Sequence, residues 1–100
     1  MIIAIVKATI VSGKHEELRT IANKLQYECA PQEEGCEQYE SFIDRDTFIT
    51  LERWTNQEAL DNHLKTKHVV EFVPQMRNCV EGGTFAVQLI NTTDISFVTL

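Results

Sequence analysis

The spacing of apolar residues along the chain switches between two periods, and each switch predicts a new element of secondary structure. Residues 2–11 are apolar on both alternating sets, which predicts a first strand that is covered on both faces. A stripe with helical spacing follows and predicts a helix that ends near Pro31. The members of this stripe are Leu18, Ile21, Ala22, Leu25 and Cys29.

A two-residue alternation of side chains returns over residues 36–44 and 47–54 and predicts two strands. The turn between them predicts a hairpin. Thr55 and Glu58 then have the spacing of a capping box, so we expect a second helix to begin at Thr55. We expect Thr66 to cap a further helix.

That further helix carries apolar residues as far as Val80, and Pro74 should kink or split it. After a Gly-Gly pair, residues 84–91 alternate again and predict the last strand. The tail, residues 92–100, has a second short alternation. It predicts either an extra strand or a segment that swaps to a partner subunit.

The element order is therefore βαββαβ, which predicts the ferredoxin-like α+β fold, an antiparallel sheet with the helices on one face. The other face has no cover within a chain of this length. We expect a second copy of the sheet to bury it, giving a homodimer. Its apolar residues should include several of Ile2, Ala4, Val6, Phe42 and Val87, or the residues that alternate with them.

A length of 100 residues allows one domain, residues 1–100, and a net charge of -6 disfavours nucleic acid and anionic membranes as partners. The three cysteines include no CxxC pair, so we expect no disulfide framework, no zinc site and a reduced, cytoplasmic compartment. The apolar N-terminal run lacks the basic start and cleavage site of a signal peptide. No apolar run approaches the ~20 residues that span a bilayer.

The richest group of chemistry-bearing side chains lies between Glu52 and His68. His63 and His68 are five positions apart, whereas a metal-binding pair on one helix face is four apart. Because no carboxylate lies at a third-ligand spacing either, a metal site is not predicted. Each histidine is either a packed helix residue or a general base beside a cavity, since imidazole titrates near neutral pH.

Four other residues have two interpretations each. Trp54 and Tyr39 either pack in the core or contact a substrate. Lys7 interrupts an apolar strand, so its ammonium either lies at a sheet edge or points into a polar cavity, with Glu52 as its partner. There is no glycine-rich phosphate loop and no dinucleotide fingerprint, so we expect no redox cofactor.

Two patterns in the chain are similar to those of a known family. They are Glu34-Gly35-Cys36-x-x-Tyr39 and Glu52-x-Trp54, continued by Leu60-x-x-His63-Leu64-x-Thr66-x-His68. The chain resembles the antibiotic biosynthesis monooxygenase domain family over roughly its first 90 residues, an ordinary domain length. The second pattern is the more specific, and the quinol-oxidising branch of the family fits it best.

The resemblance implies a dimeric α+β barrel that oxidises quinols or anthrones with molecular oxygen and no metal or flavin. It also implies that Trp54 lines the pocket and that His63 or His68 acts on the proton of a substrate hydroxyl. In such a pocket we expect Lys7 or Tyr39 to donate to the developing oxyanion, although neither residue matches the family pattern by position.

Other branches imply other functions. The haem-degrading branch has Asn and Trp where this chain has Lys7 and His63, and the downstream position near Val73 is apolar, so haem degradation is not expected. An enzyme that processes phosphorylated autoinducer-2 stays open, because the chain has cations for a phosphosugar pocket: Lys7, Arg53, Lys65 and Lys67. A non-catalytic dimeric stress-response or binding domain also stays open, since fold alone does not determine function.

Overall fold

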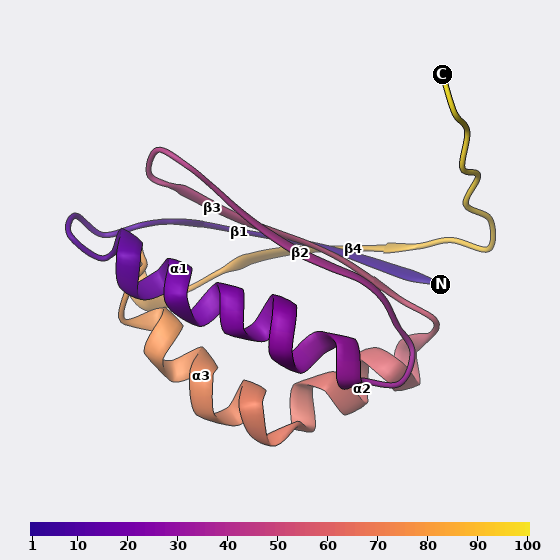
Figure 1. Cartoon of the computed structure of the whole chain (residues 1–100), viewed down its shortest axis with the longest axis horizontal. Coiled ribbons are helices and arrows are strands. Elements are labelled where there is room, and N and C mark those ends of the chain that lie inside the picture. Colours follow the sequence, from indigo (N-terminus) through magenta and orange to yellow (C-terminus); the bar gives the residue numbers. More distant parts are fainter.

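A four-stranded sheet with helices on one face forms the protein (Figure 1). The computed structural model describes residues 1–100. Strands β1 (Ile2–Thr9), β2 (Cys36–Asp44), β3 (Thr47–Trp54) and β4 (Ala86–Asn91) pair in the order β2-β3-β1-β4. All neighbouring pairs are antiparallel. The ferredoxin-like α+β prediction is therefore confirmed.

Three α-helices cover the sheet: α1 (His15–Lys24), α2 (Gln57–Lys65) and α3 (Lys67–Arg77). Beyond α1 the chain continues through a π-helical turn, Leu25–Cys29, and a 3₁₀ turn, Ala30–Gln32. This extension carries the chain past the end of the regular helix and delivers it beside α2 and α3. None of the helices has the length and apolar character needed to cross a bilayer.

The start of α2 differs from the predicted capping box. Asn56 is the N-cap, and its side chain accepts a hydrogen bond from the backbone N–H of Ala59 at 2.9 Å. The Thr55 hydroxyl instead points toward two acceptors, a carboxylate oxygen of Glu37 at 2.9 Å and the carbonyl of Gly35 at 3.2 Å. Thr55 therefore ties the start of β2 to the start of α2 rather than capping the helix.

Thr66 separates α2 from α3, as predicted. Its extended backbone (φ -63°, ψ 151°) ends α2, and its hydroxyl accepts from the Val69 N–H at 3.4 Å. The same hydroxyl donates to the carbonyl of His63 at 2.7 Å. The change of direction between α2 and α3 is thus fixed by one side chain.

Pro74 does not split α3, which continues from Lys67 to Arg77 with Pro74 inside it. The helix ends before Val80, which forms an isolated bridge with Ile10. The apolar periodicity therefore runs beyond the helix, because Val80 is buried against β1 and not on a helix face.

The two faces of the sheet are both largely apolar. Ile2 and Ala4 face the helices and are buried, so for β1 and β4 it is the alternate residues that occupy the open face. Phe42 lies on the open face as predicted, and it is 48% exposed. A shift of one residue exchanges the faces of a strand that is apolar on both, so composition could not assign them. The apolar residues of the open face are Ile3, Ile5, Phe42, Ile49, Leu51 and Ile90.

The core under the helices has two apolar clusters at opposite ends of β3. One contains Phe48 and Leu18, both fully buried, and packs α1 and α3 on the sheet. The other contains Trp54, also fully buried, and packs α2 on the sheet. The functional groups described below lie between and beside these clusters.

The tail, residues 92–100, forms neither helix nor strand within the chain and extends away from the sheet (Figure 1). It does not add a strand to the chain's own sheet. Its apolar side chains Phe97, Val98 and Leu100 are exposed. A swap of this segment to a partner subunit stays a prediction.

Candidate functional site

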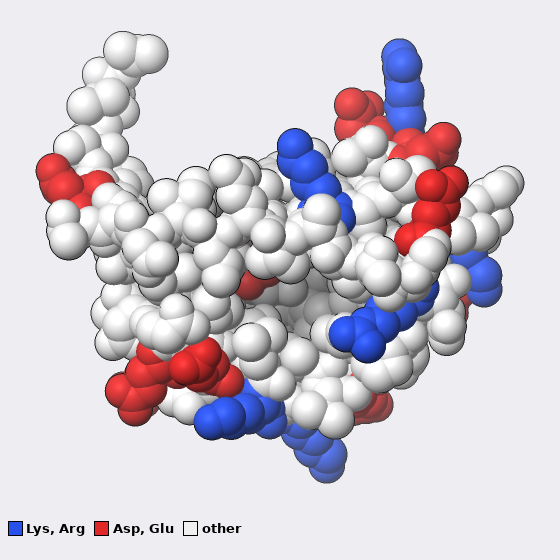
Figure 2. All heavy atoms as spheres, turned by 180° about the vertical axis from the view of Figure 1, so that it is seen from behind, with Lys and Arg blue, Asp and Glu red and all other residues white.

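A cavity of about 620 Å³ lies between the helix-facing side of the sheet and helices α2 and α3. Thirteen of its 19 lining residues are hydrophobic, Tyr39 among them, and the polar ones include Thr50, Glu52 and His63. A mostly apolar concave space with a few polar groups is the usual form of a small-molecule site. Figure 2 shows a hollow on the side turned away in Figure 1, with acidic atoms inside it and Lys and Arg side chains around it.

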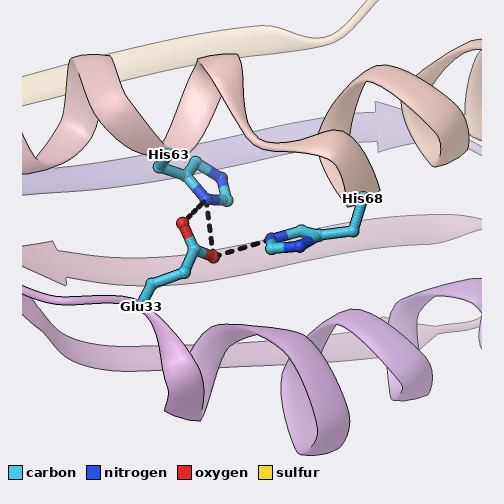
Figure 3. A group of neighbouring side chains, drawn as sticks. All are labelled: Glu33, His63 and His68. Carbon is cyan, nitrogen blue, oxygen red and sulfur yellow. Dashed lines mark hydrogen bonds and ion pairs between the residues drawn. The ribbon is translucent and has the colours of Figure 1, made fainter.

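Beside this cavity, one carboxylate holds two imidazole rings (Figure 3). Nδ1 of His63 lies 2.8 Å and 3.0 Å from the two carboxylate oxygens of Glu33. Nε2 of His68 lies 3.0 Å from Oε2 of the same residue. The side chains of Glu33 and His63 are 9% and 8% exposed, and that of His68 is 22% exposed. Glu33 is therefore a nearly buried carboxylate whose only ion-pair partners are histidines.

Three separate elements bring these groups together. Glu33 follows the 3₁₀ turn that ends the α1 region. His63 lies in the last turn of α2 and His68 in the first turn of α3, so the backbone break at Thr66 lets both rings reach one carboxylate. On a single unbroken helix, residues five positions apart would point in different directions.

Gly35 allows the close approach that this arrangement needs. Its φ of +81° lies in the left-handed region. A Cβ at this position would come within 2.5 Å of the Ala59 Cβ. The segment that carries Glu33 therefore packs against α2 more closely than any side chain would allow.

His63 has the geometry of a general base. A carboxylate on Nδ1 places the proton of the neutral ring there, which leaves the lone pair of Nε2 free. Nε2 makes no hydrogen bond within the protein, and His63 is part of the cavity wall. The ring is held by Trp54 at 4.5 Å and Tyr39 at 5.8 Å between centroids. A bound molecule can thus meet an oriented proton acceptor.

Glu52 is a second buried carboxyl group in the cavity wall, 7% exposed. Its oxygens accept from Nε1 of Trp54 at 3.0 Å and from the Thr50 hydroxyl at 2.9 Å. Burial raises the pKa of Glu52, and these donors and nearby His63 oppose the rise. The three residues alternate on one face of β3, which is why they meet.

Tyr39 provides a phenol in the same cavity. Burial, reinforced by Glu52 and Glu33, raises the pKa of Tyr39 far above its ordinary value of 10.0. The hydroxyl therefore keeps its proton, and no protein group is hydrogen-bonded to it. It is available as a donor to a bound oxygen atom.

The other predicted site residues lie elsewhere. His68 does not line the cavity but binds Glu33 from the far side. Trp54 does not line it either, because it is fully buried behind His63. Lys7 is exposed and lies on the open face, the same face as Ile5. It therefore neither enters the cavity nor pairs with Glu52. Neither of its two interpretations holds, because β1 is an inner strand of the sheet and Lys7 does not line the cavity.

Glu33 is the site residue that the sequence patterns did not identify. It lies 30 positions from His63 and 35 from His68 along the chain, so no local spacing connects them. A carboxylate thus lies beside both histidines in space although none has a third-ligand spacing along the sequence. The only sequence signal is that Glu33 directly precedes the Glu34-Gly35-Cys36 pattern.

Comparison with known proteins places these features in context. A family model described as antibiotic biosynthesis monooxygenase matches residues 1–75. A crystal structure of an antibiotic biosynthesis monooxygenase is 25% identical with a TM-score of 0.84, over 94% of this chain and 100% of that one. A conserved protein of unknown function from Bacteroides thetaiotaomicron, described as a possible oxidoreductase, is 28% identical with a TM-score of 0.79. That match covers 89% of this chain and 94% of the other.

A conserved protein from Methanosarcina mazei, at 22% identity and a TM-score of 0.85, shares the fold over 92% of both chains. No protein of curated function matches the chain.

Proposed function

Because the chain belongs to the antibiotic biosynthesis monooxygenase family, we propose that it is a cofactor-independent monooxygenase acting on a small electron-rich aromatic such as a quinol or anthrone. The observation that carries this proposal is His63, whose Nδ1 is held by Glu33 while Nε2 is free at the wall of an apolar cavity. An activated proton acceptor beside an apolar space is what this chemistry requires of a protein.

The first step is removal of a substrate hydroxyl proton by Nε2 of His63. The resulting anion transfers one electron to O₂, and the two radicals combine at the substrate carbon. An anthrone reacts as its enol tautomer: one oxygen atom becomes the product carbonyl, and the other leaves as water with the enol hydroxyl proton and the one hydrogen of that carbon. Substrate and O₂ together supply all the electrons, so no other reductant enters the balance.

Cavity chemistry supports these steps. Apolar walls leave the anion poorly solvated, which favours its oxidation. The Tyr39 hydroxyl donates to the developing oxyanion, and its raised pKa keeps the donor protonated. We assign positioning roles to Glu33, which fixes the His63 ring, and to His68, which fixes Glu33. The volume of about 620 Å³ lies within the range of drug-sized ligand pockets.

A phosphosugar substrate has less support. Arg77 is the one Lys or Arg residue in the cavity wall, which also carries Glu52. Arg53 and Lys7 lie on the open face of the sheet, and Lys65 and Lys67 are exposed. A phosphate group in this cavity would meet a carboxyl group and little positive charge.

We also propose that a second copy of the chain covers the apolar open face. That face carries six large apolar residues, and Phe42 is half exposed within it. Burial of such a face is the common reason for homodimers with closed symmetry. Sedimentation equilibrium tests this point: a monomer at micromolar concentration would contradict it.

The test of the function is oxygen uptake by metal-stripped protein with a panel of hydroquinones and anthrones. Wild type should exceed autoxidation in the presence of chelator, and His63→Ala should lose about 10²–10⁴-fold in kcat/KM. His15→Ala is the matched control, because His15 also pairs with a carboxylate, Asp46, at 3.0 Å outside the cavity. Uptake no faster than autoxidation would favour a non-catalytic binding domain.

A further inference from the structure

We propose that Glu33, His63 and His68 form a binding site for one divalent transition-metal ion, such as Zn²⁺ or Co²⁺. The three ligand atoms all lie within 4.8 Å of one another. Two imidazole nitrogens and one carboxylate oxygen suit ions of this class better than Mg²⁺ or Ca²⁺, which prefer all-oxygen sites.

The distances in the group suit a shared ion. Bonds of about 2.1 Å to a metal place neighbouring ligand atoms about 3.0–3.4 Å apart in octahedral or tetrahedral geometry. The carboxylate of Glu33 already lies 2.8–3.0 Å from both rings. The ligand atoms lie up to 4.8 Å apart, so the two rings must turn toward each other to share an ion where protons now bridge the groups.

The local charge favours a cation. Glu33 is 9% exposed, and no Lys or Arg pairs with it, so only the two histidines balance its charge. Glu52 adds a second acidic group to this region, because Glu33 and Glu52 both lie close enough to Tyr39 to raise its pKa. With neutral imidazoles the three ligands carry one negative charge, which a divalent ion more than offsets.

The group is also preorganised and accessible. Three elements fix the ligands, and the Thr66 hydroxyl holds the backbone between the two histidines. His68 is 22% exposed, so it gives an entry path that the more buried His63 and Glu33 do not. Rigid ligands lose little freedom when an ion binds.

Metal binding has a consequence that rests on the proposed function. Coordination through Nδ1 of His63 moves the ring proton to Nε2, since a neutral imidazole keeps one N–H. Nε2 then faces the cavity as a donor and can no longer accept the substrate proton. The ion would therefore inhibit the monooxygenase instead of serving it.

The direct test is titration of the full-length, metal-stripped protein with CoCl₂, followed by visible absorption, and with ZnCl₂, followed by calorimetry. We expect one ion per chain and an affinity at least 100-fold weaker in Glu33→Gln and in His68→Asn. His15→Gln is the matched control and should bind like wild type. Circular dichroism checks the fold, and His68→Asn is the variant least at risk because His68 is the most exposed of the three ligands.

Three outcomes overturn the site: no saturation below millimolar metal, unchanged affinity in both ligand variants, or an equal loss in His15→Gln. Oxygen uptake separates the site from the proposed function. If Co²⁺ binds at these ligands while the metal-free protein shows no uptake, the site stands and the function fails. Uptake that increases with metal would overturn the inhibitory role.

Discussion

Strand β3 runs through both ends of the helix-covered side of the sheet, but its inward-facing residues are apolar at one end and partly polar toward the other. At one end of β3, Phe48 packs with Leu18 in a wholly apolar cluster. Toward the other end, Thr50 and Glu52 face the same way and are also buried, and Trp54 closes the strand. A buried polar group costs free energy unless it is satisfied, so polar residues in the middle of an inward-facing row indicate a site and not a core.

The largest effect that this comparison predicts is on stability at the apolar end. Phe48→Ala should lower the free energy of unfolding by about 3–5 kcal/mol, because a fully buried ring is lost and its cavity stays partly open. Urea unfolding measures this loss. Tyr27→Ala is the control: the ring is 69% exposed, so the change should be within about 0.5 kcal/mol. Similar losses in the free energy of unfolding of Phe48→Ala and Tyr27→Ala would contradict the role of burial at this end of β3.

The polar end should protect a thiol from reaction. Burial, with Glu33 and Glu52 nearby, raises the pKa of Cys36 from 9.0 to about 11. At pH 8 about one thiol in a thousand is then a thiolate, so alkylation by iodoacetamide should be about 100-fold slower than in urea. Mass spectrometry of peptides after timed alkylation reads out this site. Equal rates in native and unfolded protein would show that the thiol is not shielded.

Loss of the carboxylate between the histidines should damage function more than stability. Glu33→Gln should lower kcat/KM about 10–100-fold, because the His63 ring loses the partner that fixes its tautomer. Imidazole ¹⁵N shifts of His63 should change at the same time, which a merely structural defect would not produce. Glu34→Gln, at the exposed neighbouring position, is the control and should keep both kcat/KM and the His63 shifts.

The smallest predicted effect is a pH dependence of stability from Glu52. Its folded-state pKa is raised above the ordinary 4.5, so the protonated form is favoured in the native state. Wild type should therefore lose stability relative to Glu52→Gln as the pH rises from about 4 toward neutrality. Urea unfolding at a series of pH values measures the difference, with exposed Glu58→Gln as the control for charge removal. A wild type that gains stability relative to Glu52→Gln as the pH rises would contradict the raised pKa.

The elements and their order could be predicted from the sequence because the two apolar periods are clear and punctuated. The sheet faces could not, since Ile2 to Val6 are apolar on both sides and a one-residue shift exchanges them. Thr66 was predicted as a cap because a cap is a local interaction. The predicted Thr55 cap is wrong because Asn56 caps the helix instead, and the Thr55 hydroxyl points toward Glu37 and Gly35 on a distant segment.

The residues of the candidate site also divide into those set by a local pattern and those set by a contact between distant segments. His63 could be named as a candidate because a histidine beside an apolar helix face followed by Thr66 and His68 is a local feature, and the resemblance to the family adds the role of a base. Glu33 could not, since its role depends on a contact made only after α1, α2 and α3 have packed. Lys7 was the opposite case: its charge drew attention, but strand alternation placed it on the far face.

Gly35 has a consequence for how this chain can vary. Because a Cβ there would meet the Ala59 Cβ at 2.5 Å, positions 35 and 59 are not independent. A saturation library at position 35 alone should return only glycine, whereas randomising both positions should add only pairs with glycine at 59 and a residue that tolerates positive φ, such as asparagine, at 35. The two residues are 24 positions apart in the sequence, yet a change at position 35 should be accepted only together with a change at position 59.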